Sequence, residues 1–275
     1  MVVIGDPAAS GESRSALFAR DSSELADAIE LAMRLGQFEI RFQPQFASAD
    51  GRLVGAEALA RWIHPLFGEI GARDLFAMAA KAGLAQQLAQ HLTSRAIACA
   101  SPWPAQLGLS LNIAPRQLLA SDFVVRLADE LRTAGIDPRQ ITLEITEEVL
   151  LGDLDLAARQ LDRLREMGIR IALDDFGAGF CNFDYLKRLP LDALKLDRSM
   201  LAGVAQGERD LAVFRAIVTL ADALGLQVVT EGVETESQRR VVVAEGCASW
   251  QGFLAGQPLP RAALMQRLQT TWNVS

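Results

Sequence analysis

Residues 169–179 read IRIALDDFGAG, an apolar run that leads directly into two adjacent aspartates and a glycine-rich segment. The apolar run predicts a buried strand. Two carboxylates at the edge of a water-poor core repel one another and lose hydration unless a cation or a shared proton compensates. Cation-dependent chemistry at Asp174 and Asp175 is therefore the first hypothesis. The alternative is that one aspartate caps the next helix while the other faces solvent, and the two aspartates taken alone favour this alternative.

Neighbouring side chains of a strand point to opposite faces of the sheet. Asp174 and Asp175 would therefore reach one site only if the strand ended at them. We expect it to end there, because Gly177 and Gly179 permit a break in the chain.

On both sides of this stretch, a glycine followed by an apolar residue recurs after helix-like segments: Gly83-Leu84, Gly135-Ile136, Gly168-Ile169, Gly225-Leu226 and Gly246-Cys247. A left-handed glycine commonly ends a helix, and the next apolar residue packs on the last turn. The preceding segments are periodic, with Ala157, Leu161 and Leu164 on one helical face. These segments predict helices with one buried side.

Short apolar runs between the helices predict eight strands: 38–42, 53–58, 107–113, 141–145, 169–173, 193–196, 227–229 and 249–254. Eight strands alternating with helices in 275 residues are typical of an α/β fold, the TIM-like (β/α)8 barrel, whose chemistry lies at the carboxyl ends of its strands. A doubly wound open sheet is the competing architecture. It usually has a glycine-rich phosphate loop after its first strand, and this sequence has none there.

The barrel predicts polar residues at strand ends, and the sequence provides them repeatedly: Glu57, Asn112, Glu144, Lys195, Glu231 and Gln251. Acidic and amide oxygens without a nearby histidine cluster favour hard cations such as Mg²⁺ or Mn²⁺ over zinc. The histidines, His64 in a predicted loop and His91 on a predicted helix, are interpreted as structural or solvated.

The bulk composition limits the class of protein. A formal charge of -7 disfavours sequence-independent nucleic-acid binding, so we expect no DNA partner. No run reaches the roughly 18 apolar residues of a membrane span. Residues 1–22 lack a secretory pattern and are interpreted as a flexible lead-in to one domain, residues 23–270. Cys99, Cys181 and Cys247 are far apart and predicted to be reduced. We expect a cytoplasmic protein.

Several motifs together resemble the EAL-domain family, phosphodiesterases of cyclic di-GMP. The signature Glu57-Ala58-Leu59 lies within AEALARW (56–62). The family's other motifs follow in its order and spacing: QP (43–44), LN (111–112), RQL (116–118), LEITE (143–147), ALDDFG (172–177), LKLDRS (194–199), EGVE (231–234) and QGF (251–253). The resemblance covers roughly residues 25–260.

This resemblance implies a barrel whose first strand is antiparallel to the others. It also implies hydrolysis of cyclic di-GMP to linear pGpG with two Mg²⁺ or Mn²⁺ ions per active site. One cation would have the ligands Glu57, Asn112, Glu144 and Asp174, and the second Asp174, Asp175 and Glu231. Catalytic roles fall to Lys195, Asp175 and Glu147, and substrate contacts to Gln43, Arg61 and Gln251. A homodimer, and sensor or cyclase modules upstream, are expected by analogy.

Some of these residues have alternative structural roles. Glu57 and Glu144 are candidates for buried partners of Arg61 or Lys195, although strand ends and family spacing favour ligation. Asn112 is a candidate cap of the helix after Pro115.

Other acidic residues are also open to two interpretations. Glu147 would lie in the first turn of a helix that Thr146 caps, where acids favour the helix dipole, and it also matches a family glutamate that steadies a loop. The role of Asp197, which would orient Lys195 or pair with Arg198, stays open.

Segment 176–186 reads FGAGFCNFDYL and departs from the family's usual Thr-Gly-Tyr-Ser-Ser at Ala178, Phe180, Cys181 and Asn182. Lost hydroxyls remove hydrogen bonds that would fix the loop. The alternative function is therefore a catalytically weak cyclic di-GMP receptor that signals through a partner protein. The phosphodiesterase is favoured because every matched ligand and Lys195 are present.

Overall fold

A computed structural model describes residues 21–146, 153–178 and 183–272. They form two compact units. Unit 1 contains the described part of Met1–Arg41 with Leu59–Ala96, and unit 2 contains Phe42–Ala58 with the described part of Ile97–Ser275. Glu147 and the loop residues Phe180, Cys181 and Asn182 lie outside the described ranges.

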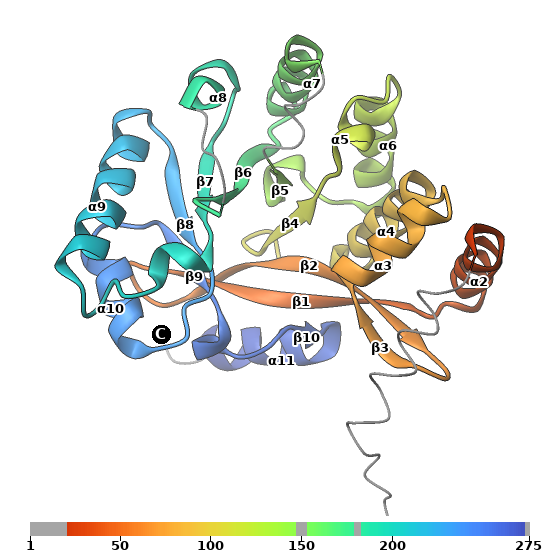
Figure 1. Ribbon diagram of the computed structural model, residues 1–275, viewed down its shortest axis with the longest axis horizontal. Coiled ribbons are helices and arrows are strands. Elements are labelled where there is room, and N and C mark those ends of the chain that lie inside the picture. The colour runs from red at the N-terminus through yellow and green to blue at the C-terminus, as the bar shows by residue number, and fades with distance from the viewer. Residues whose placement is uncertain (1–20, 147–152, 179–182, 273–275) are drawn as a thin grey trace, which may run out of the picture. The chain divides into compact units, whose positions relative to one another are not determined.

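A closed barrel of eight strands forms the centre of unit 2 (Figure 1). Its strands are β1 (Phe38–Ala47), β2 (Leu53–His64), β4 (Gly108–Asn112), β5 (Ile141–Ile145), β6 (Arg170–Phe176), β7 (Ala193–Leu196), β8 (Gln227–Thr230) and β9 (Ser249–Gln251). They pair in the order β1-β9-β8-β7-β6-β5-β4-β2, and a β1–β2 pairing closes the ring. The first parts of β1 and the last parts of β2 belong to unit 1.

The strand directions confirm the predicted barrel and exclude the open sheet. β2 and β4 to β9 are parallel neighbours, whereas β1 is antiparallel to β9. Two short strands that the sequence did not predict flank the barrel strands: β3 (Gly68–Gly71), antiparallel to β2, and β10 (Leu259–Pro260), next to β1.

Helices lie outside the strands of unit 2 in Figure 1. They are α5 (Pro115–Leu118), α6 (Phe123–Ala134), α7 (Leu154–Glu166), α8 (Phe183–Arg188), α9 (Glu208–Ala223), α10 (Glu236–Ala244) and α11 (Arg261–Trp272), with 3₁₀ turns η1 (Pro138–Gln140), η3 (Arg198–Leu201) and η4 (Phe253–Ala255). Unit 1 has α2 (Ser22–Leu35), α3 (Ala72–Lys81) and most of α4 (Ala85–Ala100). No helix in these ranges is long and apolar enough to cross a membrane.

The glycines that were predicted to end helices all have positive φ, between 69° and 95°. In each case the next residue donates its N–H to a carbonyl five residues earlier: Leu84 to Ala79, Ile136 to Leu131, Ile169 to Leu164, Leu226 to Ala221 and Cys247 to Val242. This bond is characteristic of the Schellman motif. The glycine spacing in the sequence therefore fixes where these helices stop.

The apolar side chains of the barrel strands face outward, toward the helices. Leu143, Ile145, Ile171 and Leu173 are each at most 1% exposed, and the predicted α7 face at Leu161 is fully buried. Burying such a side chain contributes about 1.5–3 kcal/mol. The strand–helix layer therefore supplies much of the stability, and the inner face of the barrel is left for polar and small residues.

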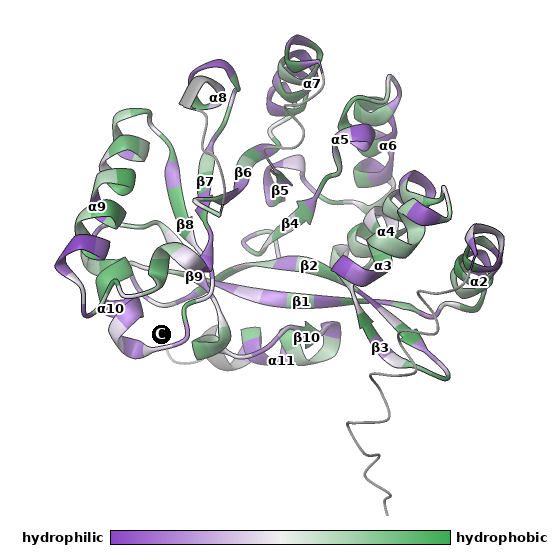
Figure 2. Ribbon diagram, in the orientation of Figure 1, coloured by the Kyte–Doolittle hydropathy of each residue, from purple (hydrophilic) through white to green (hydrophobic). Residues whose placement is uncertain are grey.

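The inner face has two layers. The upper layer lies at the carboxyl ends of the parallel strands and consists of Gln43, Glu57, Asn112, Glu144, Asp174, Lys195, Glu231 and Gln251. The lower layer lies two residues away on the same strands, on the same face, and consists of Gln45, Gly55, Ser110, Thr142, Ala172, Ala193, Val229 and Ser249. Figure 2 shows hydrophilic positions among hydrophobic ones within β6 and β7.

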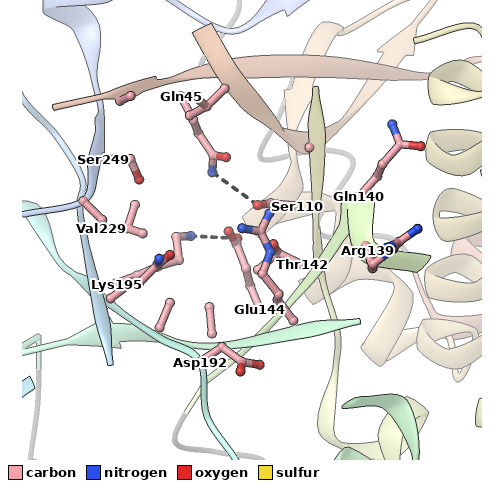
Figure 3. Close-up of a pocket in the computed structure, with 18 of the residues that line it drawn as sticks. Gln45, Ser110, Arg139, Gln140, Thr142, Glu144, Asp192, Lys195, Val229 and Ser249 are labelled. Carbon is pink, nitrogen blue, oxygen red and sulfur yellow. Dashed lines mark hydrogen bonds and ion pairs between the residues drawn. The ribbon is translucent and has the colours of Figure 1, made fainter. Parts of the chain in front are cut away.

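The lower layer does not fill the barrel. All its members except Gly55 line a cavity of about 600 Å³, which Glu144 and Lys195 of the upper layer also line (Figure 3). Bulky branched side chains usually fill this level of a TIM-type barrel. Small and hydroxyl-bearing residues here leave polar space directly beneath the charged layer.

Candidate active site

Lys195 lies at the centre of the upper layer, with its side chain only 1% exposed. Its Nζ atom is 2.6 Å from Glu231 Oε1, 2.7 Å from Glu144 Oε2 and 2.9 Å from Asp174 Oδ1. Glu57 Oε2 is further away, at 3.6 Å. An ammonium has three protons to donate, so the three nearer carboxylates match its full capacity. Strand β7 thus brings one cation to carboxylates from four other strands.

Gln251 connects two of these carboxylates. Its Nε2 atom donates to Glu57 Oε2 at 2.7 Å and to Glu231 Oε1 at 2.8 Å. The glutamine lies at the end of β9, where Gly252 (φ 155°) brings the backbone so close to Val233 that a Cβ would lie 2.3 Å from its N and O atoms. Only glycine fits there, and this close approach fixes the strand end that carries Gln251.

Asp174 and Asp175 reach the same site, but the predicted reason is wrong: strand β6 does not end at them and continues to Phe176. Between Leu173 and Phe176, three steps along β6 match two along β7, so β6 has one extra residue, a bulge. Asp175 has a φ of 56°, a left-handed conformation that aspartate tolerates better than most residues. The extra residue interrupts the alternation of the strand, so both Asp174 and Asp175 reach the same site.

The bulge creates a second acidic group beside Lys195. One carboxylate oxygen each of Asp174, Asp175 and Glu231 lies within 4.8 Å of the others. The Asp175 N–H also donates to Asp174 Oδ1 at 3.0 Å. Asn112, at the end of β4, donates from Nδ2 to Glu57 Oε1 at 2.7 Å. All six predicted metal ligands therefore lie in one hydrogen-bonded or ion-paired cluster.

Burial makes some of these carboxyls reluctant to ionise. It raises the pKa of Glu144 well above its ordinary value and that of Glu231 to about 7, with the neighbouring carboxylates adding to the effect. Burial and the charge of Asp174 likewise raise the pKa of Asp175. The cluster therefore holds more negative charge than Lys195 balances.

At Glu57 and Lys195, neighbouring charges and hydrogen bonds outweigh the effect of burial on the pKa. Burial alone would raise the pKa of Glu57, but the charge of Lys195 and hydrogen bonds from Gln251 and Asn112 keep that pKa below its ordinary value. Burial alone would lower the pKa of Lys195, but its carboxylate neighbours, Glu144 foremost, raise that pKa well above the usual range. Lys195 is therefore an ammonium at neutral pH.

The donor set fits divalent cations. Five carboxylates and one amide oxygen, from five strand ends, converge without a histidine or cysteine among them, which suits oxygen-preferring ions such as Mg²⁺ or Mn²⁺. Only one ammonium opposes the five carboxylates. Additional positive charge would allow the carboxyls with raised pKa values to ionise.

Two predicted substrate contacts lie in different surroundings. Gln43 is buried and donates from Nε2 to the Gly256 carbonyl at 3.1 Å. Arg61 belongs to unit 1, where Nε donates to Glu69 Oε1 at 3.1 Å and Nη1 to the Ala60 carbonyl at 2.8 Å. Their contacts with substrate stay predictions, and the catalytic role of Glu147 lies outside the described residues.

The structure decides most of the open alternatives. Asn112 does not cap the helix after it, because Ala114 occupies the N-cap of α5 and no side chain caps it. Glu144 does pair with buried Lys195, as the structural alternative proposed, and Arg61 pairs instead with Glu69. Asp197 accepts the Ser199 N–H at 2.9 Å and caps η3, and the charge of neighbouring Arg198 helps to lower its pKa.

Gln45 is a site residue that the sequence analysis missed. Its Nε2 atom donates to Gln251 Oε1 at 3.1 Å and to Ser110 Oγ at 3.3 Å. Residues two apart on a strand share a face, as Gln43 and Gln45 do. The predicted strand 38–42 stopped short of both, whereas β1 continues to Ala47.

A (β/α)8 barrel with oxygen ligands and a buried lysine at the carboxyl ends of its strands has the architecture of a cation-dependent enzyme. The EAL domain family matches residues 26–258. The chain belongs to the EAL-domain family.

Named relatives come from Pseudomonas aeruginosa. Cyclic di-GMP phosphodiesterase NbdA is 36% identical over 259 residues, covering 92% of this chain and 33% of NbdA. Bifunctional diguanylate cyclase/cyclic di-GMP phosphodiesterase MucR is 34% identical over 251 residues, covering 90% of this chain and 37% of MucR. The chain spans 30–42% of the length of the curated relatives it matches.

Solved structures share the fold over nearly their whole length. The PaMucR phosphodiesterase in complex with c-di-GMP has a TM-score of 0.81 and 34% identity, covering 88% of this chain and 99% of that chain. The EAL domain of Mycobacterium smegmatis DcpA has a TM-score of 0.72 and 30% identity, covering 86% and 97%.

Proposed function

We propose that the chain hydrolyses one phosphodiester bond of cyclic di-GMP and releases linear pGpG, with two Mg²⁺ or Mn²⁺ ions in the active site. The observation that carries this proposal is the complete set of oxygen ligands around buried Lys195. The names of NbdA and MucR supply the substrate class.

The ligands divide into two groups. Glu57, Asn112, Glu144 and Asp174 would hold one cation, and Asp174, Asp175 and Glu231 the other. Bound together, two divalent cations would lower the pKa of a coordinated water and neutralise charge on the attacked phosphate. Asp174 is the shared ligand, which agrees with its place between Lys195 and Asp175.

The chain's own residues would orient and stabilise the reacting groups. Lys195 stays charged and would donate to a phosphate oxygen or to the attacking water, where its charge suits an anionic transition state. Asp175 would act beside it as a catalytic carboxylate. Gln251, now holding Glu57 and Glu231, would also face the substrate at the strand ends.

The remaining roles are part of the same proposal. Arg61 offers a planar fork matched to phosphate oxygens, Gln43 an amide, and Glu147 support for the loop after β6. We also propose one catalytic domain over residues 23–270, a homodimer, further sensor or cyclase modules in the full-length protein, and a cytoplasmic location.

Chromatography of products tests the proposal. The purified chain is incubated with cyclic di-GMP and either Mg²⁺ or Mn²⁺, with EDTA as the control. We expect pGpG with either cation and none with EDTA. Tight binding of cyclic di-GMP without product at saturating cation would overturn hydrolysis and identify a receptor instead.

A further inference from the structure

We infer that Gln45 is a positioning residue, which holds the amide of Gln251 in the orientation that two metal-binding glutamates require. The inference rests on the proposed function, because it assigns Glu57 and Glu231 to cations. It adds a residue outside the ligand set, on the one antiparallel strand of the barrel, to the parts that shape the site.

The orientation of the Gln251 amide matters because its two ends have opposite polarity. Both Nε2 protons are used, one on Glu57 Oε2 and one on Glu231 Oε1. A flipped amide would turn its carbonyl oxygen toward both carboxylates, which repel it. The carbonyl Oε1 instead accepts from Gln45 Nε2 at 3.1 Å. Gln45 therefore stabilises the one orientation that serves both glutamates.

Three features hold Gln45 in place. Strand pairing sets it directly opposite Gln251 on β1 and β9. Its Nε2 atom also donates to Ser110 Oγ at 3.3 Å, and Figure 3 shows the amide pointing toward Ser110. On the next strand Gly55 leaves room for the amide, because a Cβ there would lie 2.8 Å from Gln45 Oε1.

The hydrogen bond from Gln45 to Gln251 influences the distance between the two proposed cations. Glu57 belongs to one ligand group and Glu231 to the other, and the Gln251 amide bridges them. Substituting a residue that orients metal ligands through hydrogen bonds, without binding the metal itself, typically changes metal affinity or activity by about 10- to 100-fold. Gln45 should therefore affect cation affinity and kcat more than KM.

Calorimetric titration of the purified chain with Mn²⁺ alone measures this effect without turnover. We expect Gln45→Leu, which keeps the volume but removes the donor, to weaken Mn²⁺ binding about tenfold. Gln45→Glu, which matches the shape but presents acceptors to Gln251 Oε1, should weaken it at least as much. Thr142→Val is the matched control: it lines the same cavity and should bind within about twofold of the wild type.

A double-mutant cycle separates positioning from a general structural effect. In a Gln251→Ala background, Gln45→Leu should add no further loss of Mn²⁺ affinity. An equal loss in both backgrounds would overturn the inference, as would wild-type affinity in Gln45→Leu. Circular dichroism checks folding, and if Gln45→Leu does not fold, the cycle is run with Gln45→Glu.

The two proposals fail in different ways. A wild-type chain that binds no Mn²⁺ and makes no pGpG contradicts the proposed function. A wild-type chain that does both, beside a Gln45→Leu variant with unchanged Mn²⁺ affinity and unchanged kcat, contradicts only the role of Gln45.

Discussion

The upper and lower layers of the barrel interior are carried by the same strands, two residues apart, yet they differ in charge. The upper layer combines four carboxylates and an ammonium with amides, and the lower layer combines small and hydroxyl-bearing side chains and the amide of Gln45 around a cavity of about 600 Å³. Neither is a conventional apolar core. The stability comes from the outward leucines and isoleucines, so the inner face is free to separate a charged reactive level from a neutral supporting one.

The charged level is energetically demanding, because burial removes hydration from each ion. An exposed pair such as Arg239 with Glu236, 2.6 Å apart, contributes little by comparison. The comparison predicts that substitutions in the upper layer have large effects on chemistry, and that substitutions in the lower layer have small ones unless they act through an upper-layer residue.

Removing the central charge should have the largest effect. Lys195→Met leaves the buried carboxylates unbalanced and removes the proposed donor to the reacting phosphate. We expect pGpG formation to fall by about 100- to 1000-fold, with little change in cyclic di-GMP affinity. Chromatography measures the product, and calorimetry on catalytically slow samples measures the affinity. Lys187→Met, on exposed α8, is the control. Equal losses in turnover and affinity would show that Lys195 only holds substrate.

The next test separates the two aspartates. Asp174→Asn changes the proposed shared ligand and should remove both Mn²⁺ sites in a titration. Asp175→Asn keeps a residue that tolerates positive φ and should leave one site. The number of bound ions per chain is the readout. Two sites in Asp174→Asn would contradict the shared ligand and weaken the distinction between the layers.

Adding cations should stabilise the fold through the upper layer. A ligand at 100 times its Kd contributes about 2.7 kcal/mol, which corresponds to a rise in Tm of about 5–10 °C for a domain of this size. We expect this shift with Mn²⁺ relative to EDTA in a thermal denaturation experiment, and a smaller one in Glu57→Gln. A rise in the Tm of Glu57→Gln as large as that of the wild type would show that the cation binds outside this cluster.

In EDTA, the raised pKa of Glu231 predicts a pH dependence of stability. The folded chain holds this proton up to about pH 7, whereas the ordinary pKa is 4.5. The stabilising contribution of the protonated group is therefore complete below pH 4.5 and is lost as pH rises through about 7. Denaturant unfolding should show wild type losing stability relative to Glu231→Gln across that window. The opposite slope would contradict the burial of this carboxyl.

The smallest effect is expected in the lower layer. Ser249→Ala removes a hydroxyl that lines the cavity, two residues before Gln251. Because no proposed ligand depends on it, turnover should stay within about twofold of wild type and the free energy of unfolding within about 0.5 kcal/mol, as for substitutions away from special features. A loss comparable to that of Gln45→Leu would show that the two layers do not act separately.

The sequence predicted the barrel and the polar residues that converge at its carboxyl ends, because both follow from local patterns. Glycine spacing marked helix ends, and polar residues at strand ends marked the site. It could not predict the bulge, because strand alternation placed Asp174 and Asp175 on opposite faces unless the chain broke.

The sequence offered the pairing of Lys195 with Glu144 only as one of several alternatives and did not give that of Arg61 with Glu69, because these pairings depend on distances between strands rather than on spacing along one. Gln45 lay beyond the predicted strand 38–42, and its partner Gln251 lies more than 200 residues away in the chain.

The left-handed backbone of Asp175 has an evolutionary consequence. Glycine at position 175 would relax the conformation and stabilise the fold, since a non-glycine residue there is strained by about 1 kcal/mol, yet it would delete a carboxylate from the cluster. With the role proposed for Asp175, selection for stability and selection for turnover act in opposite directions at this one codon. An aspartate retained there across relatives would indicate that turnover is under selection.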